Sequence, residues 1–185
     1  MKKVALLTSL LFALAVLASA QMDMQKDNTK RPSPPANAEC KFSNGKTIKV
    51  AYSSPRAKGR KIFADAGEKP VVPYGQIWRT GANEATTFVT DGNVNVGGKA
   101  IPAGSYTIFT IPSSDKWTLI VNKKTAEWGI PYKYEADELG RVDMKVSKTS
   151  APVENFTISF DQSGSKCTMR LEWENTRASV DITPQ

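Results

Sequence analysis

The alternation of apolar and polar residues with a period of two is the feature that most constrains the fold of this chain. Phe156, Ile158 and Phe160 alternate with polar residues, and a second run alternates from Cys167 to Trp173. Successive side chains of a strand point to opposite faces, so each run predicts a strand with one buried and one exposed face. Further predicted strands are residues 47–52, 86–90, 94–96, 106–111, 117–121, 142–146 and 178–182.

Turn signals separate these predicted strands. Asn44-Gly45 and Gly97-Gly98 supply the positive φ that tight hairpins need. No window of about eleven residues or more combines a helical apolar period with helix caps. The sequence therefore predicts an all-β, mainly antiparallel fold, built as a single β-sandwich or barrel-like domain.

Residues 1–20 are typical of a secretory signal peptide. Two lysines precede an apolar stretch, and Ala18-Ser19-Ala20 offers the small residues that signal peptidase requires. The apolar stretch is shorter than the roughly 20 residues that span a bilayer, and Gln21, not Cys, follows the expected cleavage point. We expect cleavage after Ala20 and export to the periplasm or beyond the cell, without a stable membrane span; a retained anchor is the alternative.

The rest of the chain divides into a tether and a domain. Residues 21–38 hold few large apolar groups and several prolines, which predicts a flexible Pro-rich tether. Residues 39–185 are then expected to form one β-sandwich domain, with a long loop segment around residues 53–84.

The composition excludes several classes of function. The chain has no histidine and two cysteines, which removes Ser-His-Asp and Cys-His catalysis and the usual zinc sites. We expect neither a metal nor a cofactor. The formal net charge is +7, but acidic residues are mixed in throughout, so nucleic-acid binding is not predicted.

The two cysteines are predicted to point inward. Cys40 shares a strand face with Phe42, and Cys167 shares one with Met169 and Leu171. Because export permits disulfides, we predict a Cys40–Cys167 bond. Two buried free thiols are the alternative.

The predicted loop segment concentrates the residues that suit ligand binding. Arginine forks match carboxylate, phosphate or sulfate, and Trp and Tyr faces suit a sugar ring or a flat ligand. The alternative is that Arg–Glu pairs and Trp packing only hold the loop in place. The candidate ligand-binding residues are Arg56, Arg60, Tyr74, Trp78, Arg79, Asn83 and Glu84.

Long motifs in this part of the chain resemble a known family. YSSPRAKGRKIF, VPYGQIWRTGANEATTF, IPAGSYTIFTIP and WTLIVNK with a following Trp-Gly are similar to the family catalogued as domain of unknown function 2911. The resemblance runs from about Tyr52 to Trp173. It implies an exported bacterial protein with a single β-rich domain, and it brings no assigned activity, cofactor or catalytic residue.

Three hypotheses of function remain open. The first is non-catalytic binding of an anionic or glycan ligand by Arg56, Arg60, Arg79 and Trp78. The second is an envelope hydrolase that uses Glu84 as acid or base, with the arginines stabilising negative charge and a second carboxylate roughly 5–10 Å away. The third is a structural domain of a larger assembly. No pattern in the sequence indicates an oligomeric state.

Overall fold

A computed structural model describes residues 30–185 of the chain. The predicted signal peptide and residues 21–29 of the predicted tether lie outside the described residues. Within the described range, no helix is long and apolar enough to cross a membrane.

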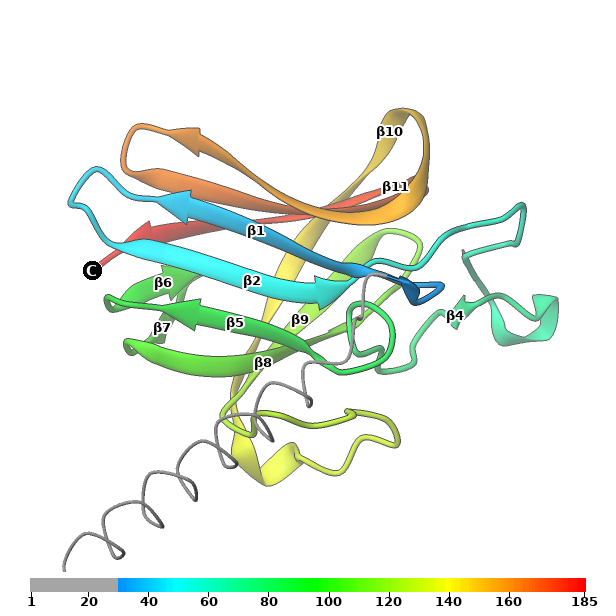
Figure 1. Ribbon diagram of the computed structural model, residues 1–185, viewed down its shortest axis with the longest axis horizontal. Helices are drawn as coiled ribbons and strands as arrows, with labels where there is room; N and C mark the ends of the chain where they lie inside the picture. Colours follow the sequence, from blue (N-terminus) through cyan, green and yellow to red (C-terminus); the bar gives the residue numbers. More distant parts are fainter. Residues whose placement is uncertain (1–29) are drawn as a thin grey trace, which may run out of the picture. The chain divides into compact units, whose positions relative to one another are not determined.

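The main feature of the described domain is a nine-stranded antiparallel sheet with the order β1-β2-β5-β8-β9-β10-β11-β6-β7 (Figure 1). The all-β, antiparallel prediction is therefore confirmed, and the sheet is not closed into a barrel. The strands are β1 (Pro35–Lys41), β2 (Thr47–Ser53), β5 (Thr86–Thr90), β6 (Val94–Val96), β7 (Lys99–Ile101), β8 (Gly104–Ile111), β9 (Lys116–Asn122), β10 (Glu138–Ser163) and β11 (Lys166–Pro184).

The long hairpin of β10 and β11 folds the sheet over on itself. The register of the pair shifts on both sides of Val153, and such irregularities bend a strand and increase its twist. Beyond the bend β10 contacts β1, and the two lie alongside each other in Figure 1. The backbone just after β2 is also hydrogen-bonded to β10. Phe156 N donates to Pro55 O at 2.8 Å, and Ala57 N donates to Glu154 O at 2.8 Å. The result is a sandwich-like single domain.

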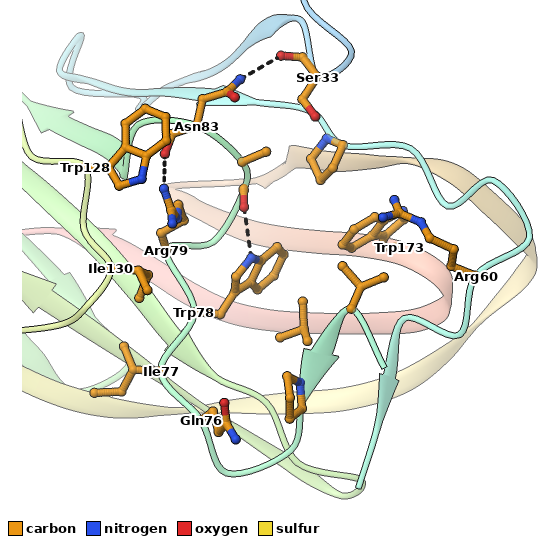
Figure 2. A pocket seen from close by; sticks show the side chains of 16 residues that line it. Ser33, Arg60, Gln76, Ile77, Trp78, Arg79, Asn83, Trp128, Ile130 and Trp173 are labelled. Atoms are coloured by element: carbon orange, nitrogen blue, oxygen red, sulfur yellow. Dashed lines mark hydrogen bonds between the residues drawn. The ribbon is translucent and has the colours of Figure 1, made fainter. Parts of the chain in front are cut away.

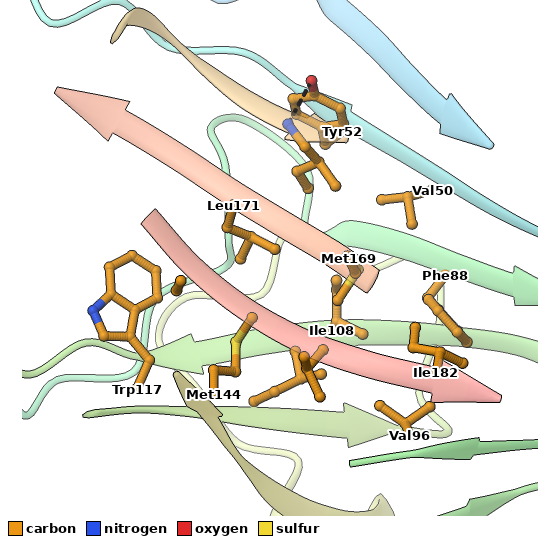
Figure 3. Close-up of a cluster of buried hydrophobic side chains, with 14 of the residues drawn as sticks. Val50, Tyr52, Phe88, Val96, Ile108, Trp117, Met144, Met169, Leu171 and Ile182 are labelled. Carbon is orange, nitrogen blue, oxygen red and sulfur yellow. Dashed lines mark hydrogen bonds between the residues drawn. The ribbon is translucent and has the colours of Figure 1, made fainter. Parts of the chain in front are cut away.

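The apolar faces of the strands meet inside this folded sheet. Ile108, Met169 and Leu171 are fully buried, as the alternation along the sequence predicts. Figure 3 shows side chains from β2, β5, β8 and β11 pointing into the common interior. Burial of a large apolar side chain contributes about 1.5–3 kcal/mol, so these residues are the main source of the domain's stability.

A disulfide between Cys40 and Cys167 confirms the predicted pairing. It joins the edge strand β1 to β11, which are not neighbours in the sheet, across a sequence separation of 127. In the chain-entropy model a loop of this length contributes about 4–5 kcal/mol to stability. The bond therefore ties β1 to β11 across the folded sheet.

The folded domain begins before the predicted boundary at residue 39. Residues 35–38 already belong to β1 and pair with residues 50–53 of β2. Proline is tolerated at the first position of an edge strand because no ladder hydrogen bond is lost there. The prediction from proline content therefore extended the tether to residue 38, although the first strand begins at Pro35.

The segment between β2 and β5 is a long loop, as predicted. It contains only the two-residue strands β3 (Phe63–Ala64) and β4 (Val72–Pro73), which pair in parallel, and the short 3₁₀ turn η2 (Ala66–Glu68). A second irregular segment, with the turn η3 (Glu135–Asp137), connects β9 to β10. These two segments supply most of the candidate site.

Candidate functional site

Trp78 anchors the β2–β5 segment to the sheet. Its ring stacks on Trp173 at a centroid distance of 5.9 Å with an interplanar angle of 18°, and it meets Phe156 edge-on at 4.8 Å. Its backbone exchanges two hydrogen bonds with Thr110 of β8, at 2.8 and 2.9 Å. Each aromatic pair contributes about 0.5–1.5 kcal/mol beyond the area it buries, so the position of Trp78 is strongly determined.

A tight turn follows Trp78 and orients the next side chains. The Trp78 indole donates to Gly81 O at 2.9 Å, and the buried Thr86 hydroxyl donates to Thr80 O at 2.7 Å. Thr80 and Asn83 both have positive φ, at 57° and 58°, a conformation that non-glycine residues adopt rarely and at a cost. The turn thus holds Arg79 and Asn83 in one arrangement.

These residues line a pocket of about 470 Å³, which is within the size range of small-ligand sites. Four of the predicted site residues border it, namely Arg60, Trp78, Arg79 and Asn83. In Figure 2, Arg79, Asn83 and Trp128 lie at one end of the pocket, while Arg60 and Trp173 lie at the other. The sixteen lining residues include no Asp or Glu.

At one end of the pocket, Arg79 lies against an exposed tryptophan. Its guanidinium carbon is 5.0 Å from the centroid of the Trp128 ring, a favourable cation–π distance, and its Nη1 donates to Asn83 O. Nε and Nη2 make no hydrogen bond within the described part of the chain. Burial lowers the pKa of Arg79, and the nearby charge of Glu84 acts in the opposite direction. A partly desolvated guanidinium with spare donors therefore faces the pocket.

At the other end, Arg60 is held by its own turn. Its Nε donates to Ala57 O at 3.0 Å, and its Nη2 donates to Arg56 O at 2.5 Å. The Nη1 group makes no hydrogen bond to any described residue. Among residues 30–185, neither Arg60 nor Arg79 forms a salt bridge with a carboxylate. The two arginines thus keep donors available for an anion.

The other three predicted residues do not line the pocket. Arg56 donates to the Asn155 side chain on β10. Tyr74 is half-buried against the main core, and burial raises the pKa of its hydroxyl. Glu84 is exposed, and its charge acts on Arg79 from outside the pocket lining. For Arg56 and Tyr74, the interpretation as loop packing accounts for the contacts.

Trp128 is the main pocket residue that the sequence analysis missed. Its side chain is 56% exposed, and it belongs to the β9–β10 segment, far from residues 52–86 in sequence. The one available signal was a large aromatic residue followed by glycine in a polar loop. Trp173, Ile130 and Ser33 were missed as well, and the backbone carbonyl of Ser33 accepts a hydrogen bond from Asn83 Nδ2 at 3.1 Å.

Buried Asn122 organises the segment that carries Trp128. Its amide donates to the Tyr132 hydroxyl at 3.0 Å and to Tyr134 O at 2.7 Å. Tyr132 in turn donates to Glu138 at 2.7 Å. Arg141 binds the same carboxylate with two nitrogens and holds the pKa of Glu138 below its usual value. This network makes the β9–β10 segment a rigid support for Trp128.

Within residues 30–185, no cluster of three or more His, Cys, Asp or Glu side chains is arranged to hold a metal ion.

The fold and the pocket together define a sandwich-like β protein with a cationic, aromatic pocket at the end of the sheet. The model of the family described as Protein of unknown function (DUF2911) matches residues 33–182, and the chain belongs to this family. The resemblance seen in the sequence motifs is thus confirmed. Comparison with curated proteins and with solved structures gave no match.

We predict that the docking of the Trp128 segment depends on Gly129. A Cβ at this position would lie 2.8 Å from Ala85 Cβ and 3.0 Å from Phe109 Cε1, and Gly129 has a φ of +90°. Gly98 is a matched control because its φ is +96° and no atom lies within 4 Å of the position of its Cβ. We expect Gly98→Ala to lower the free energy of unfolding by about 1 kcal/mol, because alanine adopts a positive φ only at a cost.

Gly129→Ala should lose about 1–3 kcal/mol more in the free energy of unfolding, because its new methyl group overpacks the site. Urea unfolding of both variants measures the difference. Equal losses would show that the segment does not pack against Ala85 as described.

Proposed function

We propose that this domain binds an anionic or saccharide ligand in the pocket between Trp128 and Arg60, without catalysing a reaction. The observation that carries the proposal is the pairing of two arginines that keep spare donors with a pocket lining free of Asp and Glu. The family assignment neither adds nor removes an activity, so the proposal depends on this chemistry.

The state of Arg79 supports an anionic group in the ligand. Its guanidinium is partly buried, which lowers the pKa of Arg79, and it makes one hydrogen bond to a backbone carbonyl. A carboxylate or phosphate at Nε and Nη2 would form charge-assisted hydrogen bonds, each worth about 1.5–3 kcal/mol. Binding of an anion would thus offset the cost of the partial desolvation of the Arg79 guanidinium, which is already present in the free protein.

The aromatic and amide groups of the pocket support a saccharide as the carrier of that anion. Trp128 is exposed at the rim, and an indole face suits stacking on a ring. Gln76 places an amide group in the same lining, and Asn83, whose Nδ2 donates to Ser33 O, adds its side-chain oxygen as an acceptor. Such groups match the hydroxyl groups of a sugar. Ligand sites commonly combine an apolar surface with a few such polar groups.

The hydrolase hypothesis gains no support from the pocket. A two-carboxylate mechanism needs paired acids around the scissile bond, and the lining contains none. The hypothesis stays a prediction that a screen of glycoside substrates tests, with activity lost in Glu84→Gln as its required result. The role of structural domain in a larger assembly likewise stays a prediction, tested by partner pull-down.

Export is part of the proposal, and the disulfide is compatible with it because such bonds persist in oxidising compartments. We predict that the mature chain purified from its native host begins at Gln21. Mass spectrometry of the intact protein measures this. A chain that retains Met1 would contradict export by a cleaved signal peptide.

The binding proposal predicts a specific effect of Arg79. In calorimetric titrations of the mature protein with glucuronate, N-acetylmuramate, inorganic phosphate and glucose, we expect at least one of the anions to bind and glucose to bind more weakly. Arg79→Ala and Arg79→Lys should each lower the affinity for that anion at least about tenfold, since both remove the guanidinium fork.

Arg56→Ala is the matched control, because Arg56 donates to Asn155 and does not line the pocket. Its affinity should stay within about twofold of the wild type. Unchanged affinity in both Arg79 variants, or no binding of any probe to the wild type, would refute the proposed site.

A further inference from the structure

A second pocket of about 400 Å³ adjoins the first and shares Arg60 with it. Its lining comes from the turn after β2 and from the bend of the β10–β11 hairpin, where Val153 pairs with Glu174. Trp173 lines the first pocket and its neighbour Glu174 lines the second. The two pockets therefore share Arg60 as a lining residue.

The turn that carries Arg60 is well fixed. Ala57 N donates to Glu154 O at 2.8 Å, Lys58 N donates to the Glu154 carboxylate at 2.9 Å, and the guanidinium itself donates to Ala57 O and Arg56 O. Arg60 is nevertheless exposed. A ligand that passes from one pocket to the other would thus meet a positioned guanidinium at the junction.

The two pockets differ in charge. The first contains two arginines and no acid. The second contains Arg60 and Lys61 together with Glu154 and Glu174, and Lys61 also pairs with Glu68. A balanced set of donors and acceptors matches neutral hydroxyl groups, whereas a second anionic group would gain little net attraction there because the two glutamates oppose the two cations.

Several backbone groups of the residues that line the second pocket are already hydrogen-bonded. Ala57 N donates to Glu154 O, Arg60 N donates to Ala57 O, and Lys61 O accepts from Val71 N, so charged side chains are prominent among the partners left for a ligand. Such partners suit hydroxyl groups arranged around a ring better than an extended peptide, which requires free backbone groups in register. The chemistry of this pocket therefore favours a sugar.

We propose that the ligand is an oligosaccharide in which acidic and neutral sugars alternate, bound across both pockets with Arg60 at the junction. Its acidic sugar lies in the first pocket between Arg79 and Arg60, and its neutral sugar lies in the second. This inference rests on the proposed function, because it extends the ligand that the first pocket binds.

The test compares chains of matched length by calorimetry. The probes are glucuronate, a tetrasaccharide of alternating glucuronate and N-acetylglucosamine, tetragalacturonate as the all-acidic chain and chitotetraose as the all-neutral chain. The alternating tetrasaccharide should bind at least about tenfold more tightly than each of the other three probes.

A variant of the second pocket tests its role directly. Glu154→Gln with Glu174→Gln removes the two like charges while keeping side-chain shape, so the affinity for tetragalacturonate should rise about tenfold. Glu39→Gln, an exposed carboxylate on β1, is the control and should leave that affinity unchanged. The melting temperature of each variant confirms that it is folded.

The outcomes separate the two proposals. Equal affinity for glucuronate and the alternating tetrasaccharide would overturn the extended site and leave the first pocket as a binding site. Equally tight binding of the all-acidic or all-neutral chain, or an unchanged affinity of the double variant for tetragalacturonate, would also overturn the inference. Failure of every probe to bind the wild-type protein would overturn both proposals.

Discussion

The stack of Trp78 on Trp173 is the contact on which the candidate site depends. It attaches the long segment between β2 and β5 to strand β11, and two backbone hydrogen bonds attach the same residue to β8. Because both contacts hold Trp78, the strained turn after it has one orientation. That orientation brings Arg79 and Asn83 to the pocket and keeps the donors of Arg79 facing it.

The opposite wall of the pocket has an independent support. Trp128 lies on the β9–β10 segment, which buried Asn122 ties together through Tyr132 and Tyr134, and Gly129 allows that segment to approach Ala85 closely. Two segments distant in sequence are thus each braced against the sheet before any ligand arrives. A site organised in this way loses less conformational entropy on binding than a flexible one.

The strands were predictable because the alternation of apolar and polar residues is a property of each short segment of sequence. A period of two specifies which face of a strand is buried, and this same rule placed Cys40 and Cys167 inward, whereas their pairing was predicted from the expected export. The start of β1 was not predictable, since Pro35 is tolerated only because its strand is an edge. The bend of β10 near Val153 depends on packing against β1 and residues 54–57. These long-range contacts cannot be predicted from the residues around Val153.

The types of residue in the candidate site could be predicted from the sequence, but which of them line the pocket could not. Arg60, Trp78, Arg79 and Asn83 line the pocket, as a segment rich in arginine and aromatic residues indicated. Arg56 carries the same functional group, but its bridge to Asn155 on β10 is a long-range contact that its sequence neighbours do not reveal. Trp128 joins the site by the same kind of long-range contact, through its approach to Arg79.

The most direct test of the account follows the indole N–H signals of the four tryptophans by NMR during titration with whichever of glucuronate, N-acetylmuramate and inorganic phosphate binds most tightly. Trp128 borders the pocket and stacks with Arg79, so its signal should shift most. Trp117 is buried, does not line the pocket, and finds no hydrogen-bond partner for its indole N–H within the described part of the chain, so its signal should stay in place. An unmoved Trp128 signal at a saturating concentration of that anion would contradict the assignment of this pocket as the ligand site.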